Sequence, residues 1–80
     1  MIRIFVLDRI EDETGISGTG VVAEGIEFSN NKCVLSWLTE HKSIAIYESI
    51  EEVEAIHGHN GKTVIRFLHG IEYAKDFPRE

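Results

Sequence analysis

The chain has 80 residues, of which 42% are hydrophobic and 28% are charged, and its formal net charge at pH 7 is −6. This length predicts one domain with a thin margin of stability, because so short a chain buries only about 60–65% of the surface that its unfolded form exposes. The composition argues against a disordered chain, and the acidic charge argues against binding to a nucleic-acid backbone, which needs clustered Lys and Arg.

The single cysteine and the hydropathy of the sequence indicate where in the cell the protein is expected. Cys33 is the one cysteine of the sequence, and its place in an expected strand favours a small buried side chain over a reactive thiol. No apolar run approaches the ~20 residues of a membrane span, and the start of the chain alternates like a strand instead of a signal peptide. We therefore expect a cytoplasmic protein with no membrane partner.

The first expected element is a strand over residues 2–7. Its alternation places Ile2, Ile4 and Val6 on one side and Arg3, Phe5 and Leu7 on the other, so both faces should be at least partly covered. Residues 8–20 then combine acids with glycines and hydroxyl residues, a composition that predicts a loop. A loop of this length in so small a domain is more often functional than idle.

Residues 19–39 predict a β-hairpin that turns at Asn30 and Asn31, since asparagine enters the left-handed backbone region at low cost. A two-residue turn at these positions fixes the register of the two strands. It pairs Phe28 with Cys33, Ile26 with Leu35, Glu24 with Trp37 and Val22 with Thr39. That register predicts a face that is apolar except at Glu24, with Glu24 and Trp37 side by side.

A fourth strand is expected over residues 43–47, and the clearest local signal of the sequence follows it. Ser49 and Glu52 form a capping box, which predicts the start of a helix. Apolar residues recur at helical spacing at Ile50, Val53 and Ile56. Gly58 is placed to end this helix after His57.

Asn60 and Gly61 give a strong turn signal, and residues 63–68 predict a fifth strand. The order β-β-β-β-α-β predicts an α+β fold, namely a small antiparallel sheet or open barrel of about five strands with one short helix. One short helix covers only part of such a sheet, so we expect a homo-oligomer, preferably a dimer that packs sheet against sheet. Residues 1–70 form the single domain of this prediction, and residues 71–80 form a C-terminal tail.

The glycine-rich part of the first loop is a candidate ligand site. Ser17, Gly18, Thr19 and Gly20 have the composition of an anion-binding nest, in which backbone amides converge and hydroxyls add donors. The segment lacks the lysine of a phosphate-binding loop, and it leads into a strand instead of a helix. Two interpretations of this segment therefore remain open: a contact to a phosphate or nucleotide, or a plain glycine-rich turn at the start of the strand.

His57 and His59 flank Gly58 at the end of the predicted helix. With Glu54 one turn earlier they would supply three metal ligands, but zinc generally needs a better-defined set, and we predict neither a metal nor a cofactor. A histidine at a helix C-terminus is favoured by the helix dipole in any protein. In a third interpretation, both imidazoles donate hydrogen bonds to an anionic ligand.

Glu24 is unusual because the predicted register places it on an otherwise apolar face. A carboxylate in that position must be paired, hydrogen-bonded or protonated. It either reaches water at the rim, or it lines a pocket in which Trp37 offers a flat surface to a stacked base.

No catalytic nucleophile can be assigned from the sequence. Cys33 has no histidine at nearby spacing, and no serine lies in a triad or elbow context. A carboxylate pair for acid–base chemistry cannot be distinguished among fourteen acids. We therefore predict that the protein is not an enzyme.

Three segments, SGTGVVAEGIEF, VLSWL and YESIEEVEAIHGHNGKT, resemble a family of very small proteins found among bacteriophages, actinobacteria and halophilic archaea. The resemblance covers residues 14–65, and the tail IEYAKDFPRE extends past the usual end of the family. The resemblance gives no catalytic residues for this sequence. It implies a compact standalone domain associated with phages. By analogy, small phage proteins of this kind antagonise host defence, either by binding a defence protein or by sequestering a nucleotide signal.

The sequence is compatible with two functions. In the first, a pocket built from the glycine loop, Glu24, Trp37, His57 and His59 holds a phosphate-bearing or nucleotide-like small molecule. In the second, an acidic surface docks onto a basic host or defence protein and blocks it. The acids of that surface are Glu11–Glu13, Glu40, Glu48 and Glu51–Glu54.

Overall fold

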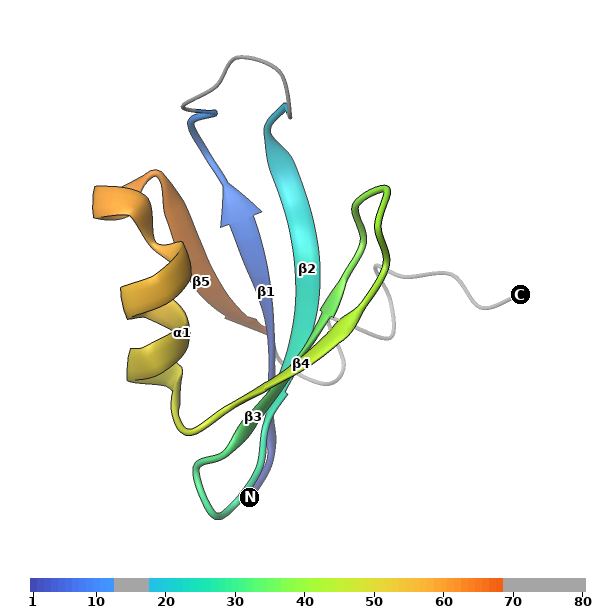
Figure 1. The fold of residues 1–80 in the computed structure, drawn as a ribbon. Coiled ribbons are helices and arrows are strands. Elements are labelled where there is room, and N and C mark those ends of the chain that lie inside the picture. Colours follow the sequence, from blue (N-terminus) through green and yellow to red (C-terminus); the bar gives the residue numbers. More distant parts are fainter. Residues whose placement is uncertain (13–17, 69–80) are drawn as a thin grey trace.

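The computed structural model describes residues 1–12 and 18–68. In these ranges five strands form one open sheet, and one α-helix packs on one of its faces (Figure 1). The elements are β1 (Arg3–Arg9), β2 (Gly20–Glu27), β3 (Cys33–Trp37), β4 (Ile44–Tyr47), α1 (Ile50–His57), a 3-10 turn η1 (His59–Gly61) and β5 (Thr63–Leu68). The predicted α+β class and the order β-β-β-β-α-β are confirmed.

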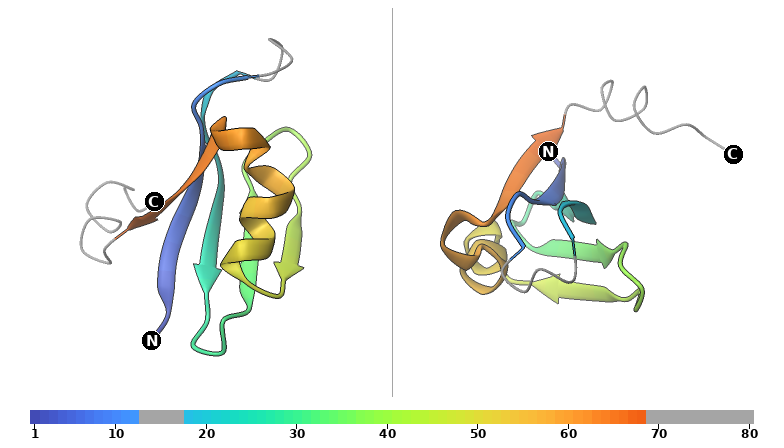
Figure 2. Two further views of the ribbon diagram at one scale, coloured as in Figure 1. Left: turned by 90° about the vertical axis from the view of Figure 1, so that its left-hand side faces the viewer. Right: turned by 90° about the horizontal axis from the view of Figure 1, so that it is seen from above.

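All neighbouring strands are antiparallel, and their order across the sheet is β4-β3-β2-β1-β5. β1 is therefore an interior strand, in agreement with the apolar residues on both of its faces. The sheet curves round the helix, so that both edge strands, β4 and β5, contact α1 (Figure 2). Within the described ranges, no helix covers the opposite face of the sheet, and no helix is long and apolar enough to cross a membrane.

The core lies between the sheet and α1. Its largest fully buried side chains are Phe5, Leu7, Leu35, Val53 and Cys33, and Trp37, Tyr47, Ile50 and Ile65 pack against this cluster while half-buried. The buried position predicted for Cys33 is confirmed, and burial raises the pKa of its thiol. The Phe5 ring packs directly over Gly25, its partner on β2, where a Cβ atom would overlap the ring.

Both ends of the predicted helix are confirmed. The hydroxyl of Ser49 accepts a hydrogen bond from the backbone amide of Glu52 at 3.2 Å. The Glu52 carboxylate reaches back to the amide of Glu48 at 2.8 Å, one residue before the usual partner in a capping box. At the other end the amide of Gly58 donates to the carbonyl oxygen of Glu54 at 2.8 Å, and this close approach leaves no room for a Cβ atom at position 58.

The hairpin between β2 and β3 turns through three residues instead of the predicted two. The amide of Phe28 donates to the carbonyl of Lys32 at 2.8 Å, and the amide of Asn31 donates to the carbonyl of Phe28 at 2.8 Å. Asn31 takes a left-handed conformation with φ of 76°, while Asn30 does not. A turn of this kind, with one left-handed residue at its end, is the usual three-residue hairpin loop.

This extra turn residue shifts the register by one, so the predicted pairing of Glu24 with Trp37 is wrong. Glu24 pairs with Ser36, and Trp37 pairs with Ala23. Because successive side chains of a strand point to opposite faces, the shift places Trp37 on the face covered by α1 and leaves Glu24 on the uncovered face.

β1 also continues two residues beyond the prediction, through Asp8 and Arg9. These residues pair with Val64 and Thr63 of β5 on one side and with β2 on the other, where a bulge follows Leu7. Backbone pairing on both sides therefore holds them in a strand despite the weak strand propensity of the surrounding sequence. Ser17 and the predicted tail, 71–80, lie outside the described residues.

Candidate functional site

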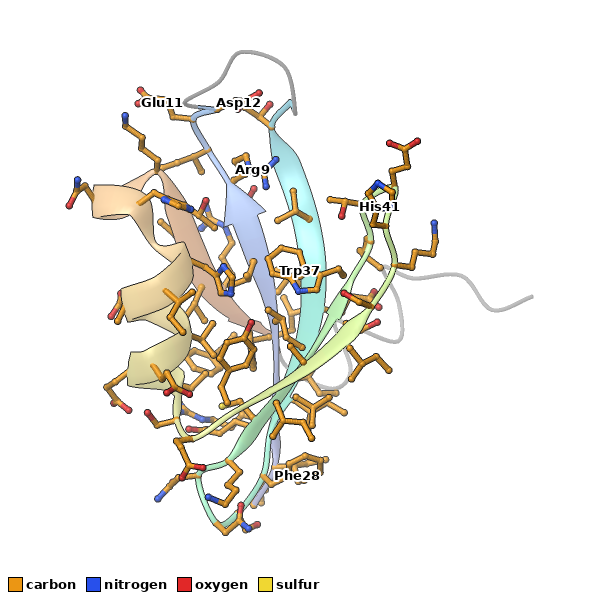
Figure 3. The ribbon with its side chains drawn as sticks, viewed as in Figure 1. Arg9, Glu11, Asp12, Phe28, Trp37 and His41 are labelled. Atoms are coloured by element: carbon orange, nitrogen blue, oxygen red, sulfur yellow. The ribbon has the colours of Figure 1, made fainter. Side chains whose placement is uncertain are left out.

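Four side chains of different elements meet where α1 ends. Arg9 comes from the end of β1 and Trp37 from the end of β3 (Figure 3). His57 comes from the last turn of α1 and His59 from η1. With Leu7, Val22 and Thr63 they line a cavity of about 20 Å³. We call Arg9, Trp37, His57 and His59 the helix-end corner.

The imidazole of His57 is held by two aromatic neighbours. Its ring lies edge to face with the indole of Trp37, with centroids 5.0 Å apart, and it also lies edge to face with the ring of Tyr47 at 5.6 Å. The hydroxyl of Tyr47 and Nε2 of His57 share a hydrogen bond of 2.7 Å. These contacts fix the orientation of the imidazole and leave Nδ1 as its remaining polar atom.

Burial sets the charge state of this pair. It lowers the pKa of the His57 imidazole, and the nearby His59 lowers it further. Burial also raises the pKa of the Tyr47 hydroxyl, with a smaller contribution from the charge of Glu52. At neutral pH the pair is therefore an uncharged imidazole hydrogen-bonded to an un-ionised phenol.

The turn that presents His59 is conformationally strained. Three consecutive residues have positive φ values, 48° at His59, 56° at Asn60 and 90° at Gly61. Such values cost little for glycine, but they are uncommon for histidine. Strained backbone of this kind is concentrated at binding and catalytic sites, and here it adjoins the helix-end corner.

Gly18, from the predicted glycine-rich segment, lies next to this corner. The carbonyl of Gly18 accepts a hydrogen bond from a terminal nitrogen of Arg9 at 3.4 Å. The amide of Gly18 donates to the Asp12 carboxylate at 2.6 Å, so a carboxylate of the chain occupies part of the predicted anion nest. Gly18 and Gly20 have φ values of 85° and 111°, and Thr19 is exposed.

Glu24 does not join the other predicted site residues. It lies on the uncovered face of the sheet, in a groove of about 250 Å³ with Ser36 and four other residues, Ile4, Gly25, Ile26 and Val34. The prediction that Glu24 and Trp37 line one pocket is therefore wrong. The structure brings together Trp37, His57 and His59, and it places Gly18 beside them through Arg9.

A cavity of about 470 Å³ lies between α1 and β5. Among the residues that the structure describes, its lining has no Lys, Arg or His side chain and includes Glu54. This chemistry does not suit a phosphate group, although the volume would hold one.

A metal at the helix end is not supported by the geometry. In residues 1–12 and 18–68, no three side chains of His, Cys, Asp or Glu lie close enough together to hold a metal ion. Glu54, His57 and His59 thus do not form the ligand set that their spacing suggested.

Sequence reasoning missed three residues of the site, namely Arg9, Tyr47 and Thr63. Arg9 was assigned to the loop, because its neighbours resemble loop residues and only the pairing of β1 with two strands shows otherwise. Alternation on β4 places Ala45 and Tyr47 on one face, but the sequence does not say which strand they join. No local signal distinguishes Thr63 from any other first residue of a strand.

Residues 2–69 match the model of a protein family described as Acb5 phage protein. The matched range includes all five strands and α1, and it supports the phage association that the sequence resemblance implied. No curated protein and no solved structure matches the chain.

Proposed function

Since the chain belongs to the Acb5 phage protein family, we propose that it is a small phage protein that holds a phosphate-bearing, nucleotide-like molecule at the helix-end corner. In this proposal the protein acts in the cytoplasm of the host and removes a nucleotide signal of the host's defence. It binds the molecule without converting it.

One observation carries the proposal: a guanidinium, an indole and two imidazoles line the same small cavity. A guanidinium offers paired donors that match phosphate oxygens, and imidazoles add further donors. An indole offers an apolar surface for a base or a sugar. These are the group types that a nucleotide requires, and they are drawn from four separate elements.

The size of the cavity determines where such a ligand sits. About 20 Å³ is room for roughly one ordered water, far less than a nucleotide needs. The ligand therefore lies over the corner instead of inside it, with its phosphate directed toward Arg9. The exposed residues Gly18 and His59 form the outer edge of this site.

The pairing of His57 with Tyr47 favours a second candidate function, the cleavage of a phosphodiester. If Nε2–H of His57 donates to Tyr47, Nδ1 carries a lone pair and suits a general base. His57 would take the proton of an attacking hydroxyl as the new oxygen–phosphorus bond forms. His59 would give a proton to the leaving oxygen as the bond between that oxygen and phosphorus breaks.

Docking through an acidic surface has weaker support. Oε1 of Glu11 lies 3.5 Å from Nζ of Lys62, and Oε1 of Glu48 lies 2.7 Å from Nζ of Lys32. Both carboxylates are therefore engaged in ion pairs within the chain. Glu52 is engaged in capping α1. Binding to a protein partner through these acids would weaken strongly with added salt, whereas a ligand at the corner need not depend on them.

The test is a titration of the intrinsic fluorescence of Trp37, the one tryptophan of the chain, with a panel of linear and cyclic nucleotides. We expect a saturable change with at least one of them, weakened at least tenfold by Arg9→Gln and by His59→Gln. His41→Gln is the matched control, because His41 is exposed in the loop between β3 and β4, away from the corner (Figure 3). A flat response to every nucleotide would contradict the proposal.

Chromatography of the bound nucleotide separates the two candidates. Recovery of the intact molecule after prolonged incubation supports binding without turnover. Products that disappear with His57→Asn, while binding persists, would establish cleavage instead.

A further inference from the structure

The backbone amide of Gly18 already holds an acidic group of the chain. It donates a hydrogen bond to Oδ2 of the Asp12 carboxylate at 2.6 Å, and this contact lies at the surface of the protein. A hydrogen bond from a backbone amide to a carboxylate is short and strong, and a phosphate oxygen accepts the same kind of bond. The Asp12 carboxylate therefore marks the position of an oxyanion at Gly18.

The carbonyl end of Gly18 joins this position to the helix-end corner. Its oxygen accepts a hydrogen bond from a terminal nitrogen of Arg9 at 3.4 Å, and Arg9 lines the cavity of the corner. Figure 3 shows Arg9 and Asp12 at the same end of the sheet. The guanidinium of the corner and the carboxylate of Asp12 thus contact the same residue.

Gly18 has room for a larger anion. It is exposed, and a Cβ atom there would meet no other atom of the described residues within 4 Å. Its φ of 85° is a conformation that glycine adopts at low cost. The described residues therefore put no steric barrier on this side of Gly18, and the Asp12 carboxylate is the group that an incoming phosphate has to replace.

We propose that the Gly18 amide is the phosphate subsite of the helix-end corner and that Asp12 competes with the ligand for it. A bound phosphate replaces the carboxylate at this amide and lies beside the guanidinium of Arg9. The inference rests on the proposed function, because it assigns the phosphate of that ligand to one donor. Asp12 lowers the affinity in two ways: its carboxylate occupies the donor, and its negative charge opposes the charge of the phosphate.

This competition favours nucleotides over free phosphate. Free phosphate gains contacts with Gly18 and Arg9 only, and the Asp12 carboxylate opposes both. A nucleotide gains the contact of its base or sugar with Trp37 as well, which offsets the displacement of Asp12. Asp12 is therefore a specificity-determining residue of the proposed site.

The test is the dissociation constant of the full chain for adenosine monophosphate, measured by Trp37 fluorescence. Asp12→Asn keeps an oxygen acceptor for the Gly18 amide and removes the charge, whereas Asp12→Ala removes both. We expect both variants to bind adenosine monophosphate more tightly than the wild type, by roughly threefold or more, the size expected from one exposed charge. Neither variant should gain affinity for adenosine, which has no phosphate.

Glu11→Gln is the matched control for the loss of charge. Glu11 precedes Asp12 in the chain, and its carboxylate pairs with Lys62. This variant removes the same charge without freeing the Gly18 amide, so its affinity for adenosine monophosphate should stay close to that of the wild type. An equal gain in Glu11→Gln would show that net charge alone causes the effect, and the proposed subsite would be wrong.

A purely structural role of Asp12 predicts a different result. If the carboxylate only holds Gly18 in place, Asp12→Ala binds adenosine monophosphate more weakly than the wild type, and Asp12→Asn binds it equally well. That result overturns this inference, as does the absence of binding in the wild type and both variants. The proposed function fails separately, through a flat response of the wild type to every nucleotide of the panel.

Amide signals in nuclear magnetic resonance spectra locate the phosphate directly. In Asp12→Ala, the amide signal of Gly18 should shift in proportion to bound adenosine monophosphate. If this signal is unchanged at saturation while the ring signals of the corner histidines shift, the ligand binds at the corner without using Gly18. The inference is then overturned and the proposed function stands.

Discussion

The indole of Trp37 and the imidazole of His57 lie edge to face with ring centroids 5.0 Å apart and ring planes at 70°. Trp37 ends β3 and His57 ends α1, so this contact joins the sheet to the helix at the helix-end corner. Because the sequence has one tryptophan, the tryptophan fluorescence comes from this position alone. Trp37 fluorescence is therefore a direct probe of the protonation state of His57.

Trp37 fluorescence should titrate with a midpoint below pH 6.5, the ordinary value for histidine. Burial lowers the pKa of His57, and a protonated imidazole in contact with an indole quenches its emission. The measurement is a fluorescence titration between pH 8 and pH 4. His57→Asn should abolish this step, while His41→Gln should leave it unchanged. A midpoint above pH 6.5 would show that the imidazole is not buried as described.

The free energy of unfolding should fall as the pH is lowered below about 6.5. The pKa of His57 is lower in the folded chain than in the unfolded chain, so above this pH the imidazole is neutral in both and the stability is fully present. Below it, the unfolded chain takes up a proton that the folded chain accepts only at lower pH. Urea denaturation at several pH values measures this loss, and His57→Gln should flatten it. If the free energy of unfolding of His57→Gln falls with pH as steeply as that of the wild type, other titrating groups cause the loss.

Gly25→Ala should destabilise the fold by about 1–3 kcal/mol, because the new methyl group would overlap the ring of Phe5. Adding Phe5→Leu should cost less in the Gly25→Ala background than in the wild type, since the smaller side chain makes room. Urea denaturation of the two single variants and the double variant measures this coupling.

Gly61→Ala is the matched control for that cycle. At Gly61 an added methyl group meets open space, and its cost of about 1–2 kcal/mol comes from a φ of 90°. Phe5→Leu should therefore not relieve it. Equal coupling of both glycines to Phe5 would contradict the packing described for Gly25.

Ser49→Ala should cost about 1 kcal/mol, because the amide of Glu52 loses the acceptor that caps α1. Ser49→Asp should retain most of the stability, since its carboxylate also accepts this hydrogen bond. Ser43→Ala, at an exposed position before β4, serves as the control, with an expected change below about 0.5 kcal/mol. Equal effects at positions 43 and 49 in urea denaturation would argue against the cap.

The helix was predictable from sequence because its signals are local. The capping box at Ser49 and the glycine at position 58 each act within one turn of the chain, and both ends of α1 agree with them. The five strands were predictable for the same reason, since alternation is a property of each segment alone.

The register of the hairpin was not predictable, because it depends on how many residues the turn contains. Two adjacent asparagines are compatible with a two-residue turn, and the chain uses a three-residue turn in which Asn31 alone is left-handed. That single residue moved Trp37 to the face of α1 and separated it from Glu24. The contribution of Arg9 was missed for a related reason, since its place in β1 depends on pairing with two distant strands.

Nuclear magnetic resonance of the histidine rings tests the ligand site most directly. The protein is titrated with the nucleotide that gives the largest fluorescence change, and the ring signals are assigned by single His→Gln variants. We predict that the signals of His57 and His59 shift in proportion to bound nucleotide, while the signals of His41 do not respond. Shifts at His41 equal to those at His57 and His59, or no shift at either corner histidine at saturation, would contradict binding at the helix-end corner.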